Sequence, residues 1–397
     1  MIRKRTTLIL GAGSSQHLFF PLGQELIRNV CDLIYVKSVG VKKQFHGTHT
    51  EYIEQEEKNS VLLSRFLEKT EHKKQDGSYY SPEDIEKFAQ DLYQAQTPSI
   101  DTFLTRRSEY SLLGKLCVIF CLSRYENEGD HVIYKPWKSM NPQWSFDFGW
   151  YQYLWHRMVD GCEKLDHLKQ NKLKIITFNY DRSLEHFLIT AIKSCFGVNE
   201  ADAAEVFKHI KIKHVFGKLG KFYWEVNYLE DNSGKTADDY MLETAPYTPW
   251  ELRCFFRLMG DVGEYGMDRR DFEGERTVLS QDARKGIVKK FNHVVKNIKT
   301  YHEIVEEKKT KEYYEDLQNS EKVCFFGFGY HSQNLKALGF HDRKIGDFEL
   351  SGSMYGFSDL EKETEESGLR VMTSKQSPKF SNKLHGRDFF EHFAPLE

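Results

Sequence analysis

The sequence Leu-Lys-Ile-Ile-Thr-Phe-Asn-Tyr-Asp, residues 173–181, predicts a buried strand that ends in polar side chains. An apolar run from Leu173 to Phe178 is followed at once by Asn179, and a helical pattern of apolar residues begins at Leu184. Open α/β sheets bind their ligands at the carboxyl ends of such strands. An asparagine there could merely tolerate a turn, but its amide also offers a donor and an acceptor, which suits a ribose diol or a positioned water.

A second unit of the same kind opens the chain. The strand expected at Thr6–Leu10 runs into the turn Gly11-Ala12-Gly13-Ser14-Ser15, and apolar residues from Leu22 to Ile34 fit one face of a helix. Glycines at such a turn let the backbone approach a pyrophosphate, and the helix amino terminus supplies donors. Gln16 stands where a dinucleotide-binding motif has its third glycine, so a tight turn without a ligand is the alternative.

Further strands are expected at Ile210–Phe216, Val323–Phe326, Phe348–Leu350 and Leu369–Met372. Alternating strands and helices predict an α/β fold, a Rossmann-like doubly wound parallel sheet covered on both faces. The intervals between strands exceed simple crossovers and predict large, mainly helical insertions. On this interpretation the chain is a single domain. Its nucleotide-binding core comprises residues of about 1–35, 170–220 and 320–375, with insertions of about 36–169 and 221–319.

Two helix starts and one long helix are expected within the insertions. Ser81-Pro82-Glu83-Asp84 and Pro98-Ser99-Ile100-Asp101 have the residues that begin helices. From Ile287 to Val305 the apolar residues follow a four-three spacing, which predicts one helix with a narrow apolar seam. That seam would pack on its own domain or, alternatively, form a subunit contact.

Composition excludes some classes of function. The 56 basic and 59 acidic residues leave a formal charge of -3, which gives no overall field for nucleic acid or membrane binding. No apolar run approaches the roughly 20 residues that span a bilayer, so we expect a cytoplasmic protein. The seven cysteines are scattered without a Cys-x-x-Cys pair, which suggests neither a zinc module nor a disulfide framework.

Two titratable residues are candidates for the site, each with a structural alternative. His214 falls on the inward face of an alternating strand, where it could serve as a general base or be a core histidine bonded to a backbone carbonyl. Asp181 could bind a ligand or simply cap the helix that follows. His46, His49 and His72 lie in a charged insertion, where a solvated loop is the expected state rather than a metal site.

Taken together, the two strand-turn-helix units resemble the Sir2 superfamily, and specifically its bacterial Sir2-like members. The sirtuin pattern Gly-Ala-Gly-x-Ser, with a proline six residues later, is matched by Gly11, Ala12, Gly13, Ser15 and Pro21. The pattern Thr-Gln-Asn-x-Asp is matched by Thr177, Asn179 and Asp181, with Phe178 in place of glutamine. Gly327 lies near the position of the late Gly-Thr-Ser motif. The resemblance covers about half of the chain, in three patches.

The sequence also departs from the sirtuin pattern. Leu22-Gly23-Gln24 replaces the Asp-Phe-Arg of sirtuin deacylases, and their four-cysteine zinc module is missing. Sirtuins place a catalytic histidine directly before a glycine, whereas Phe216 precedes Gly217 here. His214, two residues earlier on the same strand face, is the candidate for the displaced role. The segment Ser99–Leu104 looks like one common in the Sir2-like group that cleaves NAD during antiphage defence.

The resemblance implies an NAD+ hydrolase that releases nicotinamide and ADP-ribose and depletes NAD during abortive infection. Asn179 would hold the ribose or the attacking water, and His214 would take the proton of that water. The residues implied to bind NAD are Gly11, Ala12, Gly13, Ser14, Ser15, Pro21, Asp181, Phe216, Gly217, Gly327 and Gly329. A homo-oligomer is implied, with a HerA-type ATPase or another defence protein as its partner and nucleic acid involved only indirectly.

Two other functions remain open at this stage. An NAD-dependent protein deacylase would need an acyl-lysine channel, and the missing Asp-Phe-Arg segment and zinc module argue against it. A noncatalytic sensor of NAD or ADP-ribose would need no base, and Phe216 in the place of the usual histidine favours it.

We expect purified protein to contain no stoichiometric zinc, because no four cysteine or histidine residues have the spacing of a structural site. Elemental analysis after dialysis against a chelator tests this expectation. Zinc equimolar with the chain would reveal a site built from residues distant in sequence.

Overall fold

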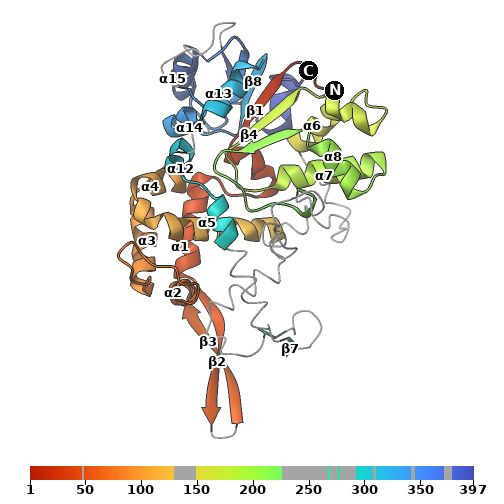
Figure 1. The fold of residues 1–397 in the computed structure, drawn as a ribbon. Helices are drawn as coiled ribbons and strands as arrows, with labels where there is room; N and C mark the ends of the chain where they lie inside the picture. The colour runs from red at the N-terminus through yellow and green to blue at the C-terminus, as the bar shows by residue number, and fades with distance from the viewer. Residues whose placement is uncertain are drawn as a thin grey trace. The chain divides into compact units, whose positions relative to one another are not determined.

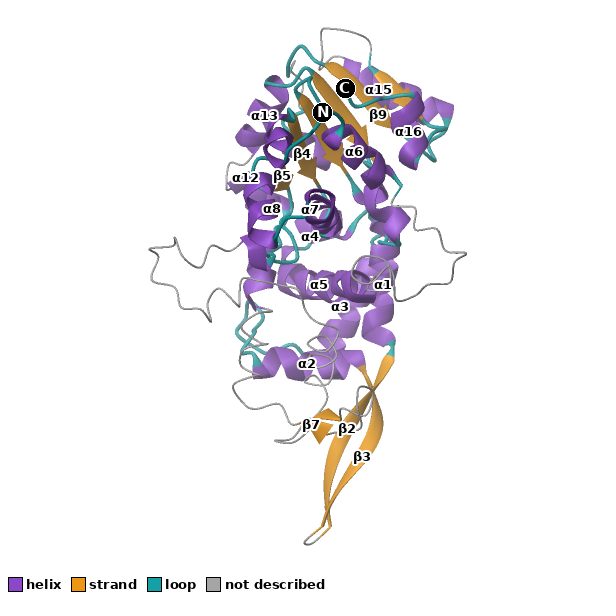
Figure 2. Cartoon of the chain, turned by 90° about the vertical axis from the view of Figure 1, so that its right-hand side faces the viewer, coloured by secondary structure: helices purple, strands orange, loops and turns teal. Residues whose placement is uncertain are grey.

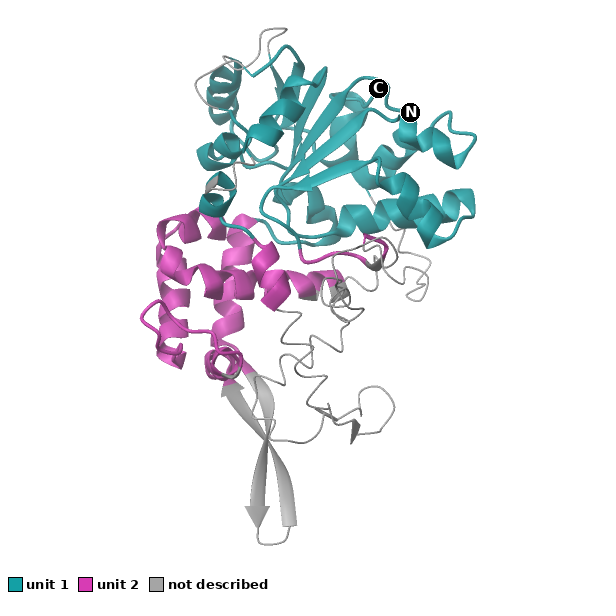
Figure 3. Cartoon of the chain, in the orientation of Figure 1, with its two compact units in different colours: residues 1–22, 129–218, 299–397 teal, residues 23–128, 219–298 magenta. Residues whose placement is uncertain are grey.

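The computed structural model describes residues 1–46, 49–128, 149–225, 267–268, 276–277, 292–306, 310–340, 345–370 and 378–397. The chain divides into two compact units, the first of residues 1–22, 129–218 and 299–397 and the second of residues 23–128 and 219–298 (Figure 3). The three segments predicted to form the nucleotide-binding core belong to the first unit, except residues 23–35 and 219–220. The organisation as a single domain stays a prediction.

A parallel sheet forms the centre of the first unit (Figure 1). Its strands are β1 (Thr6–Leu10), β4 (Leu173–Thr177), β5 (Lys211–His214), β8 (Lys322–Phe326), β9 (Glu349–Ser353) and β10 (Lys379–Ser381). They lie in the order β10-β9-β8-β1-β4-β5, and every neighbouring pair is parallel. Numbered along the chain this is the order 3-2-1-4-5-6 of a doubly wound dinucleotide-binding fold. The predicted fold class is confirmed.

The sheet has an apolar core on both faces. On one face Phe326 of β8 packs against Trp150 and Phe390, with ring centroids 5.2 and 4.7 Å away. On the other face its neighbour Phe325 packs against Phe328 at 5.0 Å. Successive side chains of a strand point to opposite faces, and all residues of β1 and β8 are buried. This double burial explains why these strands are continuous apolar runs in the sequence.

Helices of the first unit flank the sheet. They are η1 (Ala12–Leu18), α6 (Trp150–Val159), η4 (Leu165–Gln170), α7 (Ser183–Phe196), α8 (Glu200–Phe207), α12 (Tyr301–Glu306), α13 (Thr310–Gln318), α14 (Ser332–Ala337), α15 (Asp359–Arg370) and α16 (Gly386–His392). Helix α6 packs against α7 and α16, whereas α14 packs against α12 and α13, and Figure 2 shows α13 and α16 on opposite sides of the strands. Among all helices that the structure describes, none has both the length and the apolar character to span a bilayer.

The second unit is largely helical, as predicted, but also contains a long hairpin. Its elements are α1 (Gly23–Tyr35), β2 (Lys37–His46), β3 (His49–Lys58), α2 (Asn59–Lys69), α3 (Pro82–Gln94), α4 (Ile100–Arg106), η2 (Ser108–Tyr110), α5 (Ser111–Glu128), η5 (Tyr223–Glu225), β6 (Met267–Asp268) and β7 (Arg276–Thr277). Strands β2 and β3 are antiparallel, and the sequence did not predict them. The start of α3 is confirmed by a capping box between Ser81 and Asp84, and Ser99 caps α4.

The prediction of one continuous helix from Ile287 to Val305 is wrong, because the helix is interrupted at residues 298–300. Residues 287–291 lie outside the described part of the chain, and residues 292–297 are helical. Residues 298–300 are not helical, and α12 then begins anew at Tyr301. Thr300 donates its N–H and its hydroxyl to Glu303 at 2.6 and 2.8 Å, so this side-chain contact starts a second helix and interrupts the apolar seam.

The predicted strand Leu369–Met372 is also wrong. Helix α15 continues to Arg370, and residues 371–372 lie outside the described part of the chain. Leu369 is buried as a helical residue. The sixth strand is instead β10, whose three residues are too few to show a period in the sequence.

The turns after β1 and β8 touch backbone to backbone. The N–H of Gly13 donates to the carbonyl oxygen of Gly327 at 3.0 Å, and that of Gly11 donates to Phe326 at 3.1 Å. A Cβ at Gly327 would lie 2.1 Å from the backbone nitrogen of Ser14, and a Cβ at Gly11 would lie 2.5 Å from the oxygen of Gly327. Gly327 also has a φ of +60°. These positions therefore require glycine for packing, whether or not a ligand binds.

Gly327→Ala should lower the free energy of unfolding by about 3 kcal/mol or more, because its methyl group collides with backbone that cannot move aside. Gly197→Ala is the matched control, since Gly197 has a similar φ of +64° but no atom within 4 Å of an added Cβ. The control should cost about 1–2 kcal/mol, the penalty of the left-handed backbone alone. Urea unfolding measures both losses, and equal losses would contradict the tight contact.

Candidate functional site

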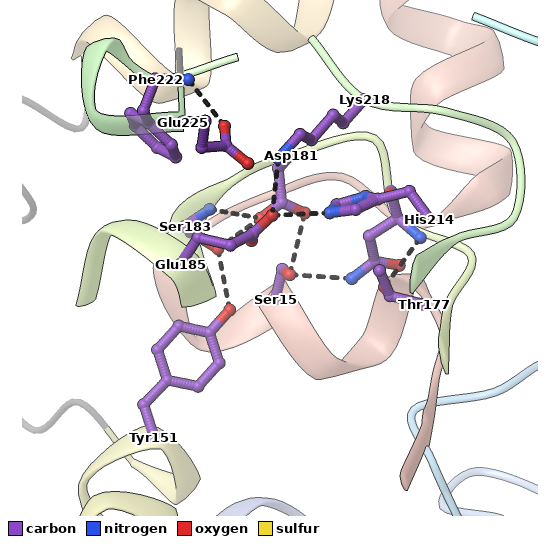
Figure 4. Close-up of polar contacts among 11 residues, drawn as sticks. Ser15, Tyr151, Thr177, Asp181, Ser183, Glu185, His214, Lys218, Phe222 and Glu225 are labelled. Carbon is purple, nitrogen blue, oxygen red and sulfur yellow. Dashed lines mark hydrogen bonds and ion pairs between the residues drawn. The ribbon is translucent and has the colours of Figure 1, made fainter. Parts of the chain in front are cut away.

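Polar side chains from several elements meet beyond the carboxyl ends of β1, β4 and β5 (Figure 4). We refer to them as the polar cluster, which consists of Ser14, Ser15, Tyr151, Asn179, Asp181, Ser183, Glu185, His214 and Lys218. All of them belong to the first compact unit. The carboxyl end of a doubly wound sheet is where ligands bind in this architecture.

Asn179 is anchored through its backbone and its side chain. Its N–H donates to the Thr177 hydroxyl at 3.1 Å, directly after the ladder of β4 ends. Its Nδ2 lies 3.0 Å from Ser14 Oγ and 2.9 Å from Ser15 Oγ, both in the glycine turn after β1. The two sequence motifs that suggested a nucleotide site are therefore joined through this amide.

Asp181 links the same two segments and also starts a helix. Its Oδ2 accepts a hydrogen bond from Ser15 Oγ at 3.0 Å. Its Oδ1 accepts from the N–H of Ser183 at 3.1 Å and from the Ser183 hydroxyl, where α7 begins. The predicted N-cap role of Asp181 is wrong, because Arg182 occupies the N-cap position of α7 and Asp181 lies one residue before it. One oxygen of Asp181 instead holds the first residue of the helix, and the other holds the glycine turn.

Helix α6 contributes two aromatic residues that sequence reasoning missed. Tyr151 Oη lies 2.8 Å from Ser183 Oγ, and the indole Nε1 of Trp150 donates to the backbone oxygen of Ser14 at 2.7 Å. Burial, together with the charge of Asp181, raises the pKa of Tyr151 well above its ordinary value. The phenol therefore stays neutral and extends the hydrogen-bonded chain that runs from Asn179 through Ser15.

A buried contact between His214 and Glu185 forms the other side of the cluster. His214, the last residue of β5, places Nε2 2.7 Å from Glu185 Oε1 and Nδ1 2.8 Å from the backbone oxygen of Asn179. The side chains of His214 and Glu185 are only 6% and 3% exposed, and Lys218 Nζ lies 3.5 Å from the same carboxylate oxygen. Burial opposes ionisation of Glu185, but the charges of His214 and Lys218 outweigh it and lower the pKa of Glu185 to about 2.

These contacts do not favour the general-base role expected of His214. A carbonyl oxygen and an ionised carboxylate can only accept hydrogen bonds, so both ring nitrogens of His214 must donate. A base needs a nitrogen lone pair within reach of the proton that it takes. In this arrangement both ring nitrogens of His214 face acceptors, and catalysis by His214 as a base stays a prediction.

The glycine turn is less open than a phosphate-binding loop. The N–H of Gly11 donates to Phe326 at the end of β8, that of Gly13 donates to Gly327, and that of Ser14 donates to the oxygen of Gly11. Three of the amides expected to hold a pyrophosphate are therefore engaged within the protein. Ala12 follows Gly11 in this turn and starts η1, and the expected role of these residues with Gly327 stays a prediction.

The other predicted binding residues lie close by but have structural contacts of their own. Phe216 is 2% exposed and packs against Phe178 and Tyr180, with ring centroids 5.6 and 6.3 Å away. Gly217 turns the chain after β5 with a φ of +79°.

Pro21 is buried beyond η1. A Cβ at Gly329 would lie 3.1 Å from His331 Nε2. Gly329 lies three residues past the end of β8, and within the described part of the chain no hydrogen bond joins Pro21 or Gly329 to the polar cluster.

Glu185 is the main site residue that the sequence analysis overlooked. It precedes the buried Leu188 and Ile189 by three and four residues, so a charge sits on the apolar face of α7. A buried charge almost always has a partner. A glutamate on the apolar face of α7 was therefore the sequence signal that could have identified Glu185.

In the described part of the chain, the three ligand-type side chains close enough to share a cation are Asp388, Glu391 and His392. All three are exposed on α16 and none of them belongs to the polar cluster. The expectation of no bound zinc stays a prediction.

No model of a known protein family matches the sequence, and no curated protein matches it either. Its function must therefore be inferred from the site itself.

Glu185→Gln should lower the free energy of unfolding at pH 7 by about 3 kcal/mol, because it leaves a buried cationic partner without its carboxylate. A depressed pKa means that the carboxylate stabilises the fold above its ordinary pKa of 4.5 and that this contribution is lost as the pH falls towards about 2. The difference between wild type and variant should therefore shrink over that range.

Glu365→Gln is the control for this pH series. Burial raises the pKa of Glu365, so its removal should have the opposite sign and stabilise the protein above pH 4.5. Urea unfolding at several pH values measures both variants. A pH-independent effect of Glu185→Gln would contradict an ionised Glu185.

Proposed function

We propose that this protein hydrolyses NAD+ at the bond between nicotinamide and ribose, releasing nicotinamide and ADP-ribose. The observation that supports this best is Asn179, whose amide is fixed at the carboxyl end of β4 by Ser14 and Ser15. In the 3-2-1-4-5-6 sheet this is the edge at which dinucleotides bind. Ser15, Asn179 and Asp181 are also polar residues that match the two Sir2-like motifs, and Ser15 hydrogen-bonds to both of the others.

The proposed reaction asks little of the protein beyond positioning. The bond from ribose C1′ to the pyridinium nitrogen breaks, and its electron pair leaves with nicotinamide, which becomes neutral. The ribose takes on oxocarbenium character until a water oxygen bonds to C1′ and releases a proton to solvent. Among the described residues Asn179 Oδ1 has no hydrogen-bond donor, so it can accept one from a ribose hydroxyl or from the attacking water.

The biological setting of the proposal comes from the Sir2-like resemblance. NAD hydrolysis by such a protein would deplete the cytoplasmic pool of NAD during abortive infection. An enzyme of that kind must stay silent until infection, which suits a regulated homo-oligomer and a partner such as a HerA-type ATPase. Within this proposal nucleic acid would act only indirectly.

A noncatalytic sensor of NAD or ADP-ribose is the second candidate. The contacts of His214 favour it, because both ring nitrogens face acceptors and His214, the expected base, then has no free lone pair. A protein deacylase is a third possibility that the same assay separates, since it would consume NAD only together with an acylated peptide.

Asn179→Ala should reduce nicotinamide release about 10²-fold or more, because it removes the group that positions ribose or water. Asn319→Ala is the matched control and should leave the rate unchanged, because Asn319 is exposed just past the end of α13. Chromatography of nicotinamide, with and without an acetylated peptide, measures the rates in a preparation with robust wild-type activity. Wild-type turnover by the Asn179 variant would remove this residue from the mechanism. Tight NAD binding by wild type without any release would favour the sensor.

A further inference from the structure

The backbone carbonyl of Asn179 lies just past the end of the sheet. The β4–β5 ladder ends at the pair Thr177 and His214, and the N–H of Val215 still donates to the oxygen of Thr177 at 2.8 Å. The backbone oxygen of Asn179, two residues after Thr177, accepts no hydrogen bond from a β5 amide in the described part of the chain. It lies instead 2.8 Å from His214 Nδ1. A side chain of β5 thus replaces the next ladder hydrogen bond.

The partner of the other ring nitrogen decides the charge of His214. Glu185 Oε1 lies 2.7 Å from Nε2 and 3.5 Å from the ammonium group of Lys218, and that positive charge favours the ionised carboxylate. With an ionised carboxylate on one side and a carbonyl oxygen on the other, the ring can satisfy both acceptors only as an imidazolium. Such charge-assisted hydrogen bonds are about twice as strong as neutral ones.

Three polar groups of Asn179 are held in this way. His214 holds the carbonyl, Thr177 holds the N–H, and two serines hold Nδ2. The orientation of the remaining atom, Oδ1, therefore depends on contacts on both sides of the turn. Loss of the hold on the carbonyl would free the peptide to rotate and would carry the carboxamide with it.

We propose that Glu185 and His214 are positioning residues. The buried imidazolium of His214 fixes the turn that contains Asn179, and Glu185 keeps both ring nitrogens of His214 protonated. The inference rests on the proposed NAD cleavage for the reaction that the turn serves. His214 then takes no proton from water, in contrast to the histidine of the motif that this chain resembles.

Two substitutions of His214 separate positioning from base catalysis. The amide nitrogen of asparagine lies two bonds beyond Cβ, as Nδ1 does, whereas that of glutamine lies three bonds beyond, as Nε2 does. His214→Asn thus keeps the donor for Asn179, and His214→Gln keeps the donor for Glu185. Neither amide can accept a proton near neutral pH.

Positioning predicts that His214→Asn keeps kcat within about tenfold of wild type, whereas His214→Gln and His214→Ala lose about 10²-fold or more. KM should change less than kcat, because the substrate still binds but its ribose is no longer correctly aligned. Equal and large losses in the asparagine and glutamine variants, with both proteins folded by circular dichroism, would overturn the positioning role and restore the base.

Nuclear magnetic resonance of ¹⁵N-histidine-labelled wild type tests the charge without any assay of activity, with the His214→Asn spectrum identifying the signals of His214. Both ring nitrogens should carry a hydrogen at neutral pH. A nitrogen with a free lone pair would overturn the inference. If the wild type cleaves no NAD the proposed function fails, while the ring nitrogens still decide this inference.

Discussion

The site depends on how closely the turn after β1 approaches the turn after β8. Gly13 and Gly327 are in backbone contact, and the added Cβ that lies 2.1 Å from Ser14 nitrogen shows how little room separates them. Because η1 starts within the first of these turns, the contact fixes the direction in which Ser14 and Ser15 leave the strand. Their hydroxyls can therefore meet the amide of Asn179 from the neighbouring strand. Backbone packing, rather than a free nest of amides, is what the glycines provide here.

The polar cluster follows from that geometry because buried polar groups must be satisfied. Ser15 and Asp181 lie 166 positions apart in the chain and are joined by a hydrogen bond at 3.0 Å. The bond continues through Ser183 to Tyr151, so each member supplies the partner of the next. Removal of one member leaves another buried group without a partner, which costs about 1–3 kcal/mol. This coupling turns two distant motifs into one rigid site.

The sequence predicted the parts of the fold that have a strong local signal. Strand β1 has the predicted bounds Thr6–Leu10, and β4 differs by one residue, since buried parallel strands are unbroken apolar runs. Asn179 and Asp181 could be singled out because their strand-end position follows from that run. The three residues of β10 carry no such period, and the hairpin β2–β3 lies in a charged segment that favours no single state.

Side-chain partners were harder to predict than strands. His214 was placed on the correct strand, but its partners come from α7 and from the turn after β4, which no spacing rule connects. Glu185 alone broke the apolar pattern of α7 and could have been paired with a cation. Thr300 and Glu303 carried a capping-box signal that the longer apolar seam obscured. Which acceptors surround a histidine depends on tertiary contacts, and those contacts decide whether it can act as a base.

A protonated His214 beside Asn179 would oppose the proposed cleavage if no negative charge compensated it. The reaction builds positive charge on the ribose, and an isolated imidazolium near the ribose would raise the energy of that state. Glu185 offsets this field because its carboxylate lies 2.7 Å from the ring. The more exposed Lys218 is partly screened by solvent. The pair thus combines a charge-assisted hold on the turn with opposite charges that largely cancel. If the proposed reaction takes place here, Glu185 is as much a part of the site as Asn179, because His214 connects the two residues.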